Sequence, residues 1–444
     1  MNREITGRLL KGFYENELKN KILPFWLERC EDRVYGGYFN CFNNEGTVLV
    51  SHDKYTWSQG RFVWIFSRLA SAKAPIFSAV QRKEFLRLAK SGRDFLMRHC
   101  LIGEGDYRCV FLMEEDGTPK HVDGCEPLDM SIYADCFVVL AMAAYSRAAG
   151  DREAYVFGKR LYGSIRSRIE KNDFYTLPYP LSHTYKAHGI PMILANVAWE
   201  MHEAAAVMGD GELKEELLRD EMWAAREVLD IFAGEDGLIR EVVCRTGERA
   251  RGMLGSHINP GHTLEDMWFM LDARELLKAE DWDSRIYEII KRTLETGWDK
   301  EYGGILHYCA LDGSQPRATS EDNREEPVVR QVEDGWGDKL WWVHSEALYT
   351  TLRSFIKTGD VEFWRWHERI FDYTFSHFPN TDPETGEWTQ ILKRDGTPQE
   401  KVVALPVKDP YHIVRNLLLI LELLYGSADS YFPSSISNTH WGAS

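Results

Sequence analysis

The stretch SHINPGHTLEDMWFMLDA, residues 256–273, sets a histidine and a carboxylate where a helix is expected to begin. His262 and Glu265 follow a Pro-Gly turn and are one helical turn apart, so both side chains leave the same face near the N-terminal end of the helix. Histidine titrates near neutral pH and is suited to accept and return protons. The pair predicts acid–base chemistry, provided that the rest of the chain builds a pocket around this face.

Three further segments that open expected helices also set charged residues among aromatic ones. They are HDKYTWSQGRFVW with Arg61, DKLWWVHSEAL with Trp341, Trp342, His344 and Glu346, and PVKDPYHIVRNLL with His412 and Arg415. These segments lie far apart in the sequence, so only the fold can bring them together. Polar groups that converge among aromatic rings are more typical of a sugar-binding cleft than of a core.

Each of these residues also has a purely structural interpretation. Glu265 could complement the helix dipole, Arg61 could extend from a packed helix, and the two tryptophans could belong to the core. Two chemical alternatives also stay open. Glu265 and Glu346 could be the paired carboxylates of a glycoside hydrolase, and His262 with Glu265 could be half of a metal site. The sequence lacks H-E-x-x-H, G-x-S-x-G, P-loop and dinucleotide-binding motifs.

Short hairpins separate the expected helices. Five segments are centred on turn sequences that allow left-handed backbone conformations, namely 36–50, 107–122, 239–254, 303–318 and 386–401. Two of these turns, at 116–119 and 395–398, have the same sequence, Asp-Gly-Thr-Pro. Between successive hairpins there is room for about two helices, as in 128–170, where Gly150-Asp151 breaks the pair.

This pattern predicts a closed ring of helices. Twelve are expected, near residues 3–28, 54–73, 81–99, 128–149, 152–170, 188–208, 211–233, 262–278, 280–297, 338–357, 361–378 and 410–426. Six joined pairs favour a toroid over an open solenoid, which would need polar capping repeats. We predict an all-α (α/α)6 barrel over residues 1–430 with a tail at 431–444. Its inner helices would enclose a funnel, with the hairpins at one mouth.

The composition favours a folded chain that binds a neutral or weakly charged ligand. Of the 444 residues, 44% are hydrophobic and 13% aromatic, enough to bury a core and still line a cleft. The net charge of −16 disfavours nucleic acid and anionic membranes as partners.

The cysteines and the N-terminus favour a cytoplasmic protein. The eight cysteines show no C-x-x-C pair, which is typical of free thiols in a reducing compartment. The first twenty residues are charged throughout and lack a hydrophobic signal segment, and no apolar run reaches the roughly 18 residues of a membrane helix.

Five segments resemble the N-acylglucosamine 2-epimerase family, which includes cellobiose 2-epimerases, mannose isomerases and sulfoquinovose isomerases. They are KYTWSQGRFVWIFSRL, NPGHTLEDMWFMLDA, KLWWVHSEAL, GEWTQILKRDGTP and LPVKDPYHIVRNL, in matching order between about residues 36 and 420. The resemblance implies an (α/α)6 barrel, in agreement with the helix pattern, and a carbohydrate isomerase, expected as a homodimer.

The resemblance also implies the catalytic residues. His262 and His412 match the two catalytic histidines, and Glu265 matches the acid that orients the chemistry. Arg61 matches the arginine that holds O1 and O2 of the ring-opened sugar.

Further residues are expected to bind the substrate. Trp342 and Glu346 fall in the family's W-W-x-x-x-E motif, Trp388 matches an aromatic residue near the substrate, and Tyr55 and His188 are expected beside them. Pro191-Met192 stands where N-acylglucosamine enzymes tend to have Pro-Met, whereas the cellobiose and mannose enzymes usually have a further histidine in this region. This favours an N-acyl hexosamine as the sugar.

The chemistry follows from the reaction. Inverting C2 of an aldose requires removal of the proton next to the C1 carbonyl and its return on the opposite face, so two groups that titrate near neutral pH must flank the carbon. A guanidinium would stabilise the enediolate oxygens, typically by ~3 kcal/mol per donor. Glu265 would fix the tautomer of a neighbouring histidine. No metal or redox cofactor is required.

Three other functions stay open at this point. An aldose–ketose isomerase needs the same enediolate, a glycoside hydrolase could use the two glutamates, and a non-catalytic sugar-binding protein would need only the cleft. The acidic stretch 314–333 is expected near the mouth, either as a mobile lid or as a solvated loop.

Overall fold

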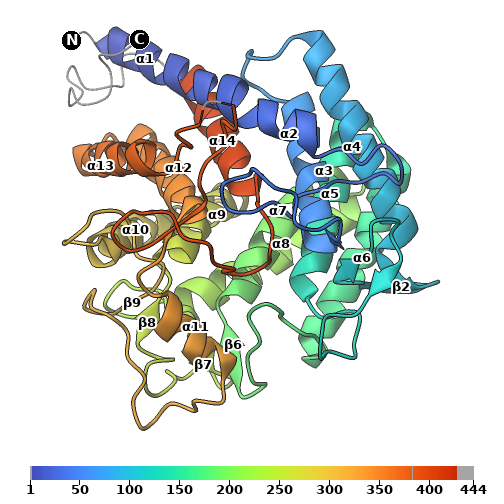
Figure 1. The fold of residues 1–444 in the computed structure, drawn as a ribbon. Coiled ribbons are helices and arrows are strands. Elements are labelled where there is room, and N and C mark those ends of the chain that lie inside the picture. The colour runs from blue at the N-terminus through green and yellow to red at the C-terminus, as the bar shows by residue number, and fades with distance from the viewer. Residues whose placement is uncertain (1–2, 383, 428–444) are drawn as a thin grey trace.

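The computed structural model describes residues 3–382 and 384–427, so the predicted tail at 431–444 lies outside the described residues. Within them, six inner helices form a closed ring, in which each contacts the next and the last contacts the first. They are α3 (Thr56–Ala70), α5 (Ile132–Ala149), α7 (Gly189–Met208), α9 (Pro260–Leu277), α12 (Trp341–Thr358) and α14 (Tyr411–Gly426). The colours of Figure 1 follow this order around the ring.

Each inner helix packs against an outer helix. The outer helices are α1 (Arg3–Asn16), continued by a π-helical segment (Glu17–Ile22) and α2 (Leu23–Arg29), then α4 (Ala79–His99), α6 (Arg152–Lys171), α8 (Gly211–Arg226), α10 (Asp283–Gly297) and α13 (Val361–His377). The ring closes where α1, near the start of the chain, packs against α14 near its end (Figure 1). This arrangement confirms the predicted (α/α)6 barrel.

The breaks between helices agree with the residues that predicted them. Gly150 ends α5 in a left-handed conformation (φ 68°), and the Asp151 side chain then caps α6 by accepting a hydrogen bond from Ala154 N at 2.9 Å. In the hairpin turns, the Asp116 and Asp395 carboxylates each accept from the backbone two residues later, at 2.9 Å.

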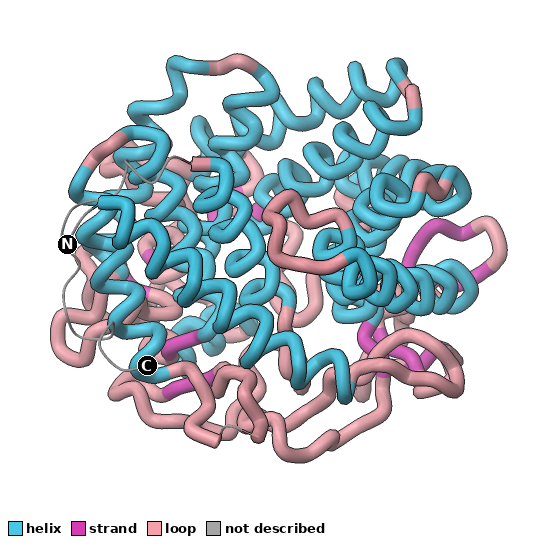
Figure 2. Tube along the Cα trace, turned by 90° about the horizontal axis from the view of Figure 1, so that it is seen from above, coloured by secondary structure: helices cyan, strands magenta, loops and turns pink. Residues whose placement is uncertain are grey.

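Short antiparallel strands lie at the rim where the inner helices begin. The pairs are β1 (Lys54–Tyr55) with β4 (Leu112–Met113) and β4 with β5 (Pro119–Lys120), β2 (Leu101–Gly103) with β3 (Asp106–Cys109), β6 (Tyr185–Ala187) with β7 (Val242–Cys244), β8 (His257–Ile258) with β9 (Cys309–Ala310), and β10 (Lys339–Leu340) with β11 (Ile391–Leu392). Because β1, β6, β8 and β10 lead almost directly into inner helices, these strands anchor the helix starts. Most loops and strands gather along one side of the ring (Figure 2).

The acidic stretch 314–333 is in part the expected solvated loop, because residues 314–326 form no helix or strand and are mostly exposed. It contains part of a further helix, α11 (Pro327–Gly335), which begins at a proline and buries Val329 and Val332 completely. The Asp322 carboxylate also accepts from Met253 N at 2.9 Å, which holds the stretch against the preceding hairpin. The sequence did not predict this helix because its apolar face is short and lies among acidic residues.

One helix also departs from the expected hydropathy. By length and composition, α5 is apolar enough to cross a membrane. It is an inner helix packed against α3, α6 and α7, and 83% of the apolar window is buried in the protein. Burial on all sides explains its composition.

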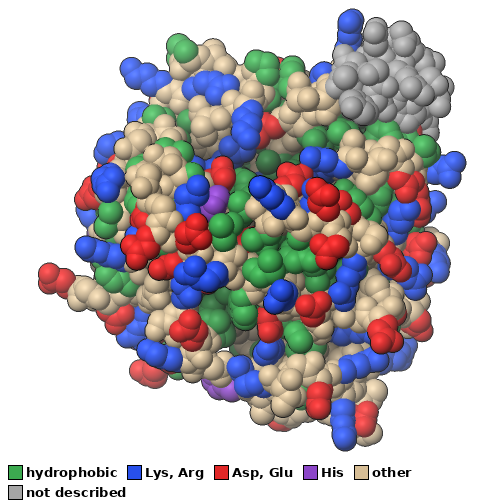
Figure 3. All heavy atoms as spheres, turned by 180° about the vertical axis from the view of Figure 1, so that it is seen from behind, with side chains coloured by type: hydrophobic (Ala, Val, Ile, Leu, Met, Phe, Trp, Pro, Cys, Tyr) green, Lys and Arg blue, Asp and Glu red, His purple; other side chains and the backbone are tan. Residues whose placement is uncertain are grey.

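On the face seen in Figure 3, acidic and basic side chains are interspersed around an apolar area near the centre.

The close approach of α3 and α5 gives a stability test. A Cβ added to Gly60 would lie 2.6 Å from the Phe137 carbonyl, so Gly60→Ala should lower the free energy of unfolding by about 1–3 kcal/mol in chemical denaturation. Gly163 on the exposed side of α6 has no atom within 4 Å of an added Cβ, so Gly163→Ala should stabilise by about 0.5–1 kcal/mol. A Gly60→Ala protein as stable as the parent would contradict this packing.

Candidate active site

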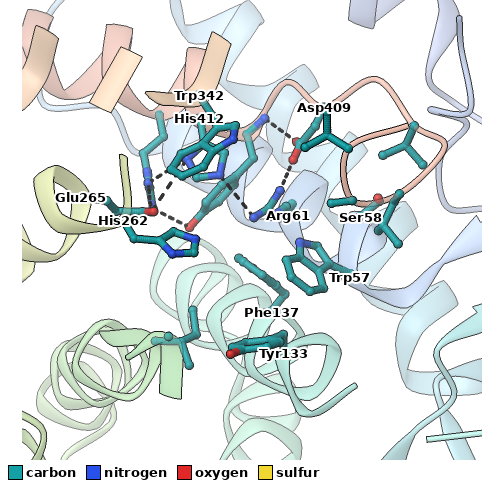
Figure 4. Close-up of a pocket in the computed structure, with 18 of the residues that line it drawn as sticks. Trp57, Ser58, Arg61, Tyr133, Phe137, His262, Glu265, Trp342, Asp409 and His412 are labelled. Atoms are coloured by element: carbon teal, nitrogen blue, oxygen red, sulfur yellow. Dashed lines mark hydrogen bonds and ion pairs between the residues drawn. The ribbon is translucent and has the colours of Figure 1, made fainter. Parts of the chain in front are cut away.

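One cavity opens at the rim where the inner helices begin (Figure 4). All six helices contribute a residue from their first two turns to its wall, including Arg61, Tyr133, Asn196, His262, Trp342 and His412. Tyr179 and the loop 403–409 complete the wall. The cavity contains about 1070 Å³ of empty space, a volume that includes solvent at its open mouth.

His262 is held at the start of α9 through its backbone and its ring. The side chain of Asn259 caps the helix by accepting from His262 N at 3.1 Å. The ring nitrogen Nδ1 lies 2.8 Å from Glu241 Oε2. Because the pKa of Glu241 is lowered and a carboxylate only accepts, Nδ1 is the donor. The other ring nitrogen, Nε2, is left for a ligand in the cavity that His262 lines.

His412 has a matching arrangement on α14. Its Nδ1 lies 2.7 Å from Glu346 Oε1, and its Nε2 lies 3.3 Å from Arg61 Nη2. Nδ1 also lies 3.2 Å from Arg415 Nη2, but its contact with the carboxylate is the shorter one. We therefore place the ring hydrogen on Nδ1, which donates to Glu346, so that Nε2 accepts from Arg61. Burial lowers the pKa of His412, and the cations of Arg61 and Arg415 lower it further. These effects outweigh the nearby Glu265, which raises the pKa, and the pKa of His412 falls to about 3. His412 is therefore neutral at neutral pH.

The indole of Trp342 lies beside both imidazoles. Its ring centroid is 5.3 Å from that of His262 and 5.5 Å from that of His412. The two histidines, 150 positions apart in the sequence, therefore border the same part of the cavity (Figure 4).

Arg61 is fixed beside the histidines by charge and by aromatic faces. Its guanidinium pairs with Asp409, which lies just before α14, and lies 4.2 Å from the ring centroid of Phe137. Trp57 and Tyr411 face it at 5.0 and 4.9 Å. This combination holds a cation with little freedom at the cavity wall.

The two glutamates do not have the places predicted for them. Glu265 Oε1 lies 3.8 Å from His412 Nδ1, beyond hydrogen-bond distance, and instead pairs with Arg415. The carboxylates that hold the histidines are Glu241 and Glu346. Glu346 is completely buried beneath His412 rather than exposed to a substrate. It also accepts from Asn416 at 2.7 Å and from Trp268 at 2.8 Å.

Glu265, Glu346 and His412 are close enough to hold a metal ion, with one ligand atom from each lying within 4.8 Å of the others. A guanidinium nitrogen of Arg415 is hydrogen-bonded to both carboxylates. It supplies the positive charge that two adjacent carboxylates need.

Three residues predicted to bind substrate lie away from the cavity wall. Trp388 is completely buried and donates to Glu17 at 2.8 Å, because it lies on the side of its hairpin that faces the outer helices. Tyr55 pairs with Leu112 in the β1–β4 ladder and packs on Phe111. His188 is completely buried beneath His262, where its Nδ1 lies 3.2 Å from Glu241 Oε1.

The sequence analysis missed several residues of the site. Glu241 lies in a predicted hairpin and carries no helical spacing that would point to His262. Asp409 was quoted in the motif before His412 but not singled out. Asn196 lines the cavity from the second turn of α7, and its carboxamide makes no hydrogen bond to another described residue. The one signal for Asn196 in the sequence was that it lies near the N-terminal end of an inner helix, where the other residues of the site lie.

The arrangement can take a proton from a bound molecule and return it. Each imidazole is held in one tautomer by a carboxylate, and a fixed guanidinium stands next to His412 where negative charge could develop.

Comparisons with known proteins give consistent results. Residues 37–416 match the family described as N-acylglucosamine 2-epimerase (GlcNAc 2-epimerase). The chain is 31% identical to the N-acylglucosamine 2-epimerase of Bos taurus, over 98% of this chain and 96% of that protein. It is 23% identical to a cellobiose 2-epimerase of Eubacterium cellulosolvens, over 91% and 96% of the two chains. The solved cellobiose 2-epimerase of Bacillus thermoamylovorans shares the fold with a TM-score of 0.71 at 20% identity, over 93% and 99%.

The neutral state of His412 predicts acid sensitivity. Its pKa falls from the usual 6.5 to about 3 on folding, so between these values the unfolded chain binds a proton that the folded chain excludes. The contribution of the neutral His412 to the free energy of unfolding is complete above pH 6.5 and is lost as the pH falls toward 3. His412→Asn should reduce the slope of unfolding free energy against pH, between about pH 4 and 6, by roughly 1 kcal/mol per unit.

Denaturation series at several pH values measure this slope. His121→Asn, which changes an exposed hairpin histidine, serves as the control and should keep the parent slope. An unchanged slope in His412→Asn would show that this imidazole is not held neutral.

Proposed function

This chain belongs to the N-acylglucosamine 2-epimerase family, and from that premise we propose that it inverts C2 of a free, ring-opened reducing sugar. The match over residues 37–416 and the 31% identity to the bovine epimerase support a sugar 2-epimerase. The single observation that carries the mechanism is the pair of imidazoles, His262 and His412, on one cavity with their Nδ1 atoms already bound.

The reaction needs one imidazole to start as a base and the other as an acid. His412 is neutral with an accepting Nε2, which supports its role as the base that removes the C2 proton once the sugar displaces Arg61 from this nitrogen. The C2–H electrons move into the C1–C2 bond, and the carbonyl electrons move onto O1 to give an enolate, which is an enediolate where C2 carries a hydroxyl group. His262 then donates a proton to the opposite face of C2 as the carbonyl re-forms. The roles exchange in the reverse direction.

Arg61 is placed to stabilise the enediolate. Its guanidinium is 3.3 Å from the nitrogen proposed to take the proton, so it stands next to the carbon that loses it. A donor already fixed by an ion pair and aromatic faces needs no reorganisation when charge develops on O1, an effect worth ~3 kcal/mol per donor.

The arrangement does not support a glycoside hydrolase. That reaction needs two carboxyl groups on either side of a sugar bond. Here Glu265 and Glu346 bind the same nitrogen of Arg415, and Glu346 is buried under His412, so they cannot flank a substrate.

Within the epimerases, we propose an N-acyl hexosamine as the substrate. The identity to the N-acylglucosamine enzyme, 31%, exceeds the 23% to the cellobiose enzyme. Apolar Met192 and Ile193 line the cavity beside Asn196, whose carboxamide has donors and an acceptor to spare. This combination suits an acyl group, which has an apolar end and an amide that can pair with Asn196.

Incubation with N-acetylmannosamine in deuterated water tests the reaction. We expect an epimeric aldose with deuterium at C2, detected by NMR and mass spectrometry. His262→Asn and His412→Asn should each lower the rate by about 10²–10⁴-fold, because each removes one proton carrier. His121→Asn is the control.

Other products would contradict the proposal in distinct ways. With mannose or glucose in place of the N-acyl sugar, a ketose would indicate an aldose–ketose isomerase, which returns the proton to C1. Bond cleavage in a disaccharide would indicate a hydrolase, and binding without turnover would indicate a sugar-binding protein. Near-parent turnover in either histidine variant would refute its assigned role.

The acyl site has its own test in Asn196→Leu, which keeps the volume and removes the amide. We expect kcat/KM for N-acetylmannosamine to fall about tenfold, the value of one or two neutral hydrogen bonds, with a much smaller change for mannose. Equal losses with both sugars would place the acyl group elsewhere in the cavity.

A further inference from the structure

A chain of hydrogen bonds, partly buried at His262 and fully buried at Asp266, runs from His262 into the protein and returns to the same helix. His262 Nδ1 lies 2.8 Å from Glu241 Oε2, and Glu241 Oε1 lies 3.2 Å from His188 Nδ1. His188 Nε2 lies 2.7 Å from Asp266 Oδ2. His262 and Asp266 are about one turn apart on α9, so the chain closes on one rigid element. We call these four residues the His262 relay.

His188 holds Glu241 at two points. Besides the side-chain contact, its backbone N–H donates to the Glu241 carbonyl at 2.9 Å. Phe232 packs against the imidazole with ring centroids 5.6 Å apart, and His188 is completely buried. Glu241 therefore has no freedom to turn away from His262 while His188 stays in place.

The contacts of His188 favour a cation, because its hydrogen bonds raise its pKa strongly, although burial also raises the pKa of Asp266, the partner of its Nε2. Both of its ring nitrogens face carboxylates, which only accept when ionised, so the imidazole can donate to both only if both nitrogens carry hydrogen. Burial works to lower the pKa of His188, but the hydrogen bonds to Asp266 and Glu241 outweigh burial and raise the pKa to about 10. Burial in turn favours a protonated Glu241, but His262 and His188 outweigh it and lower the pKa of Glu241.

Few other charges face the relay. The neighbouring titratable side chains are Tyr133 of α5, Tyr179, Glu221 of α8, His257, Glu265 of α9, His307 and Tyr308. Burial raises the pKa values of the tyrosines and lowers those of the two histidines, so these groups are neutral near pH 7, and burial also raises the pKa of Glu221. Glu265 is paired with Arg415. The charges of the relay itself therefore dominate the field at Glu241.

We propose that His188 and Asp266 are positioning residues for His262. The cation fixed between the two carboxylates keeps Glu241 ionised and aimed at His262 Nδ1, so that Nε2 faces the sugar. This role rests on the proposed function, in which His262 transfers the C2 proton. It replaces the direct substrate contact that the sequence predicted for His188.

The second histidine supports this interpretation. Behind His412, Glu346 is held by the cation of Arg415, together with Asn416 and Trp268. Behind His262, Glu241 is held by the cation of His188. Each imidazole therefore has a carboxylate and then a cation behind it, but the cation of His188 is titratable, whereas that of Arg415 is permanent.

The first test needs no activity. NMR of the unmodified protein labelled with 15N-histidine should show, at pH 8, a buried histidine with both ring nitrogens protonated. Asp266→Asn, which keeps the shape but removes one of the two anions, should convert that histidine to a neutral ring. If no histidine carries both ring protons at pH 8 in the unmodified protein, the proposal is overturned.

Kinetics then separate positioning from mere stability. In Asp266→Asn, His188 becomes neutral, so the negative charge of Glu241 is no longer balanced by it. Glu241 then stabilises the protonated form of His262 more strongly. The limb of the pH–kcat profile that depends on His262 should move to higher pH by about one unit. We expect kcat to fall about 10–100-fold with little change in KM. Asp135→Asn is the matched control, because Asp135 is a completely buried carboxylate of α5 paired with Arg168.

The outcomes distinguish the proposals. If Asp135→Asn and Asp266→Asn lose stability alike and neither shifts the pH profile, His188 and Asp266 are structural only and the positioning role is wrong. If the unmodified protein turns over no sugar, the proposed function fails. The relay is then judged from NMR alone, because the His262 ring signals must change in Asp266→Asn if the relay reaches that imidazole.

Discussion

The Nδ1 nitrogen of each site histidine is bound by a carboxylate, at 2.8 Å for His262 and 2.7 Å for His412, and the carboxylate behind His412 is completely buried. This constraint fixes the tautomer and orientation of both rings and leaves the two Nε2 atoms as the proton carriers. The barrel makes the constraint possible, because six inner helices begin at one rim and bring residues 150 positions apart to the same cavity. The packing of the helices thus sets the distance and orientation of the two proton-transfer groups.

The two halves of the site differ in the cation that stands behind each carboxylate. Arg415 cannot lose its proton, so the positive charge beside Glu346 is permanent, and burial keeps His412 neutral. The cation of His188 depends on two carboxylates in a closed loop on α9. His412 is therefore prepared to start as the base, and His262, which must start as the acid, is the imidazole linked to a titratable cation.

The sequence was sufficient for features with strong local signals. Helical periodicity and Gly-containing turns located the ring, and Arg61, His262, Trp342 and His412 all lie in helix starts at the cavity. It was not sufficient where tertiary packing decides. Trp388 lies in a hairpin, and only packing determines which side of that hairpin faces the cavity. Glu241 reaches His262 from another hairpin, and no spacing in the sequence links the two.

A crystal structure with the open-chain alditol of N-acetylmannosamine would test the central claim most directly, because an alditol has the extended form of the ring-opened sugar and cannot react. The account predicts C2 between the two imidazoles, within about 3.5 Å of each Nε2 and on opposite faces, with O1 near Arg61. An alditol with both imidazoles on one face of C2, or with C2 out of reach of either ring, would contradict it.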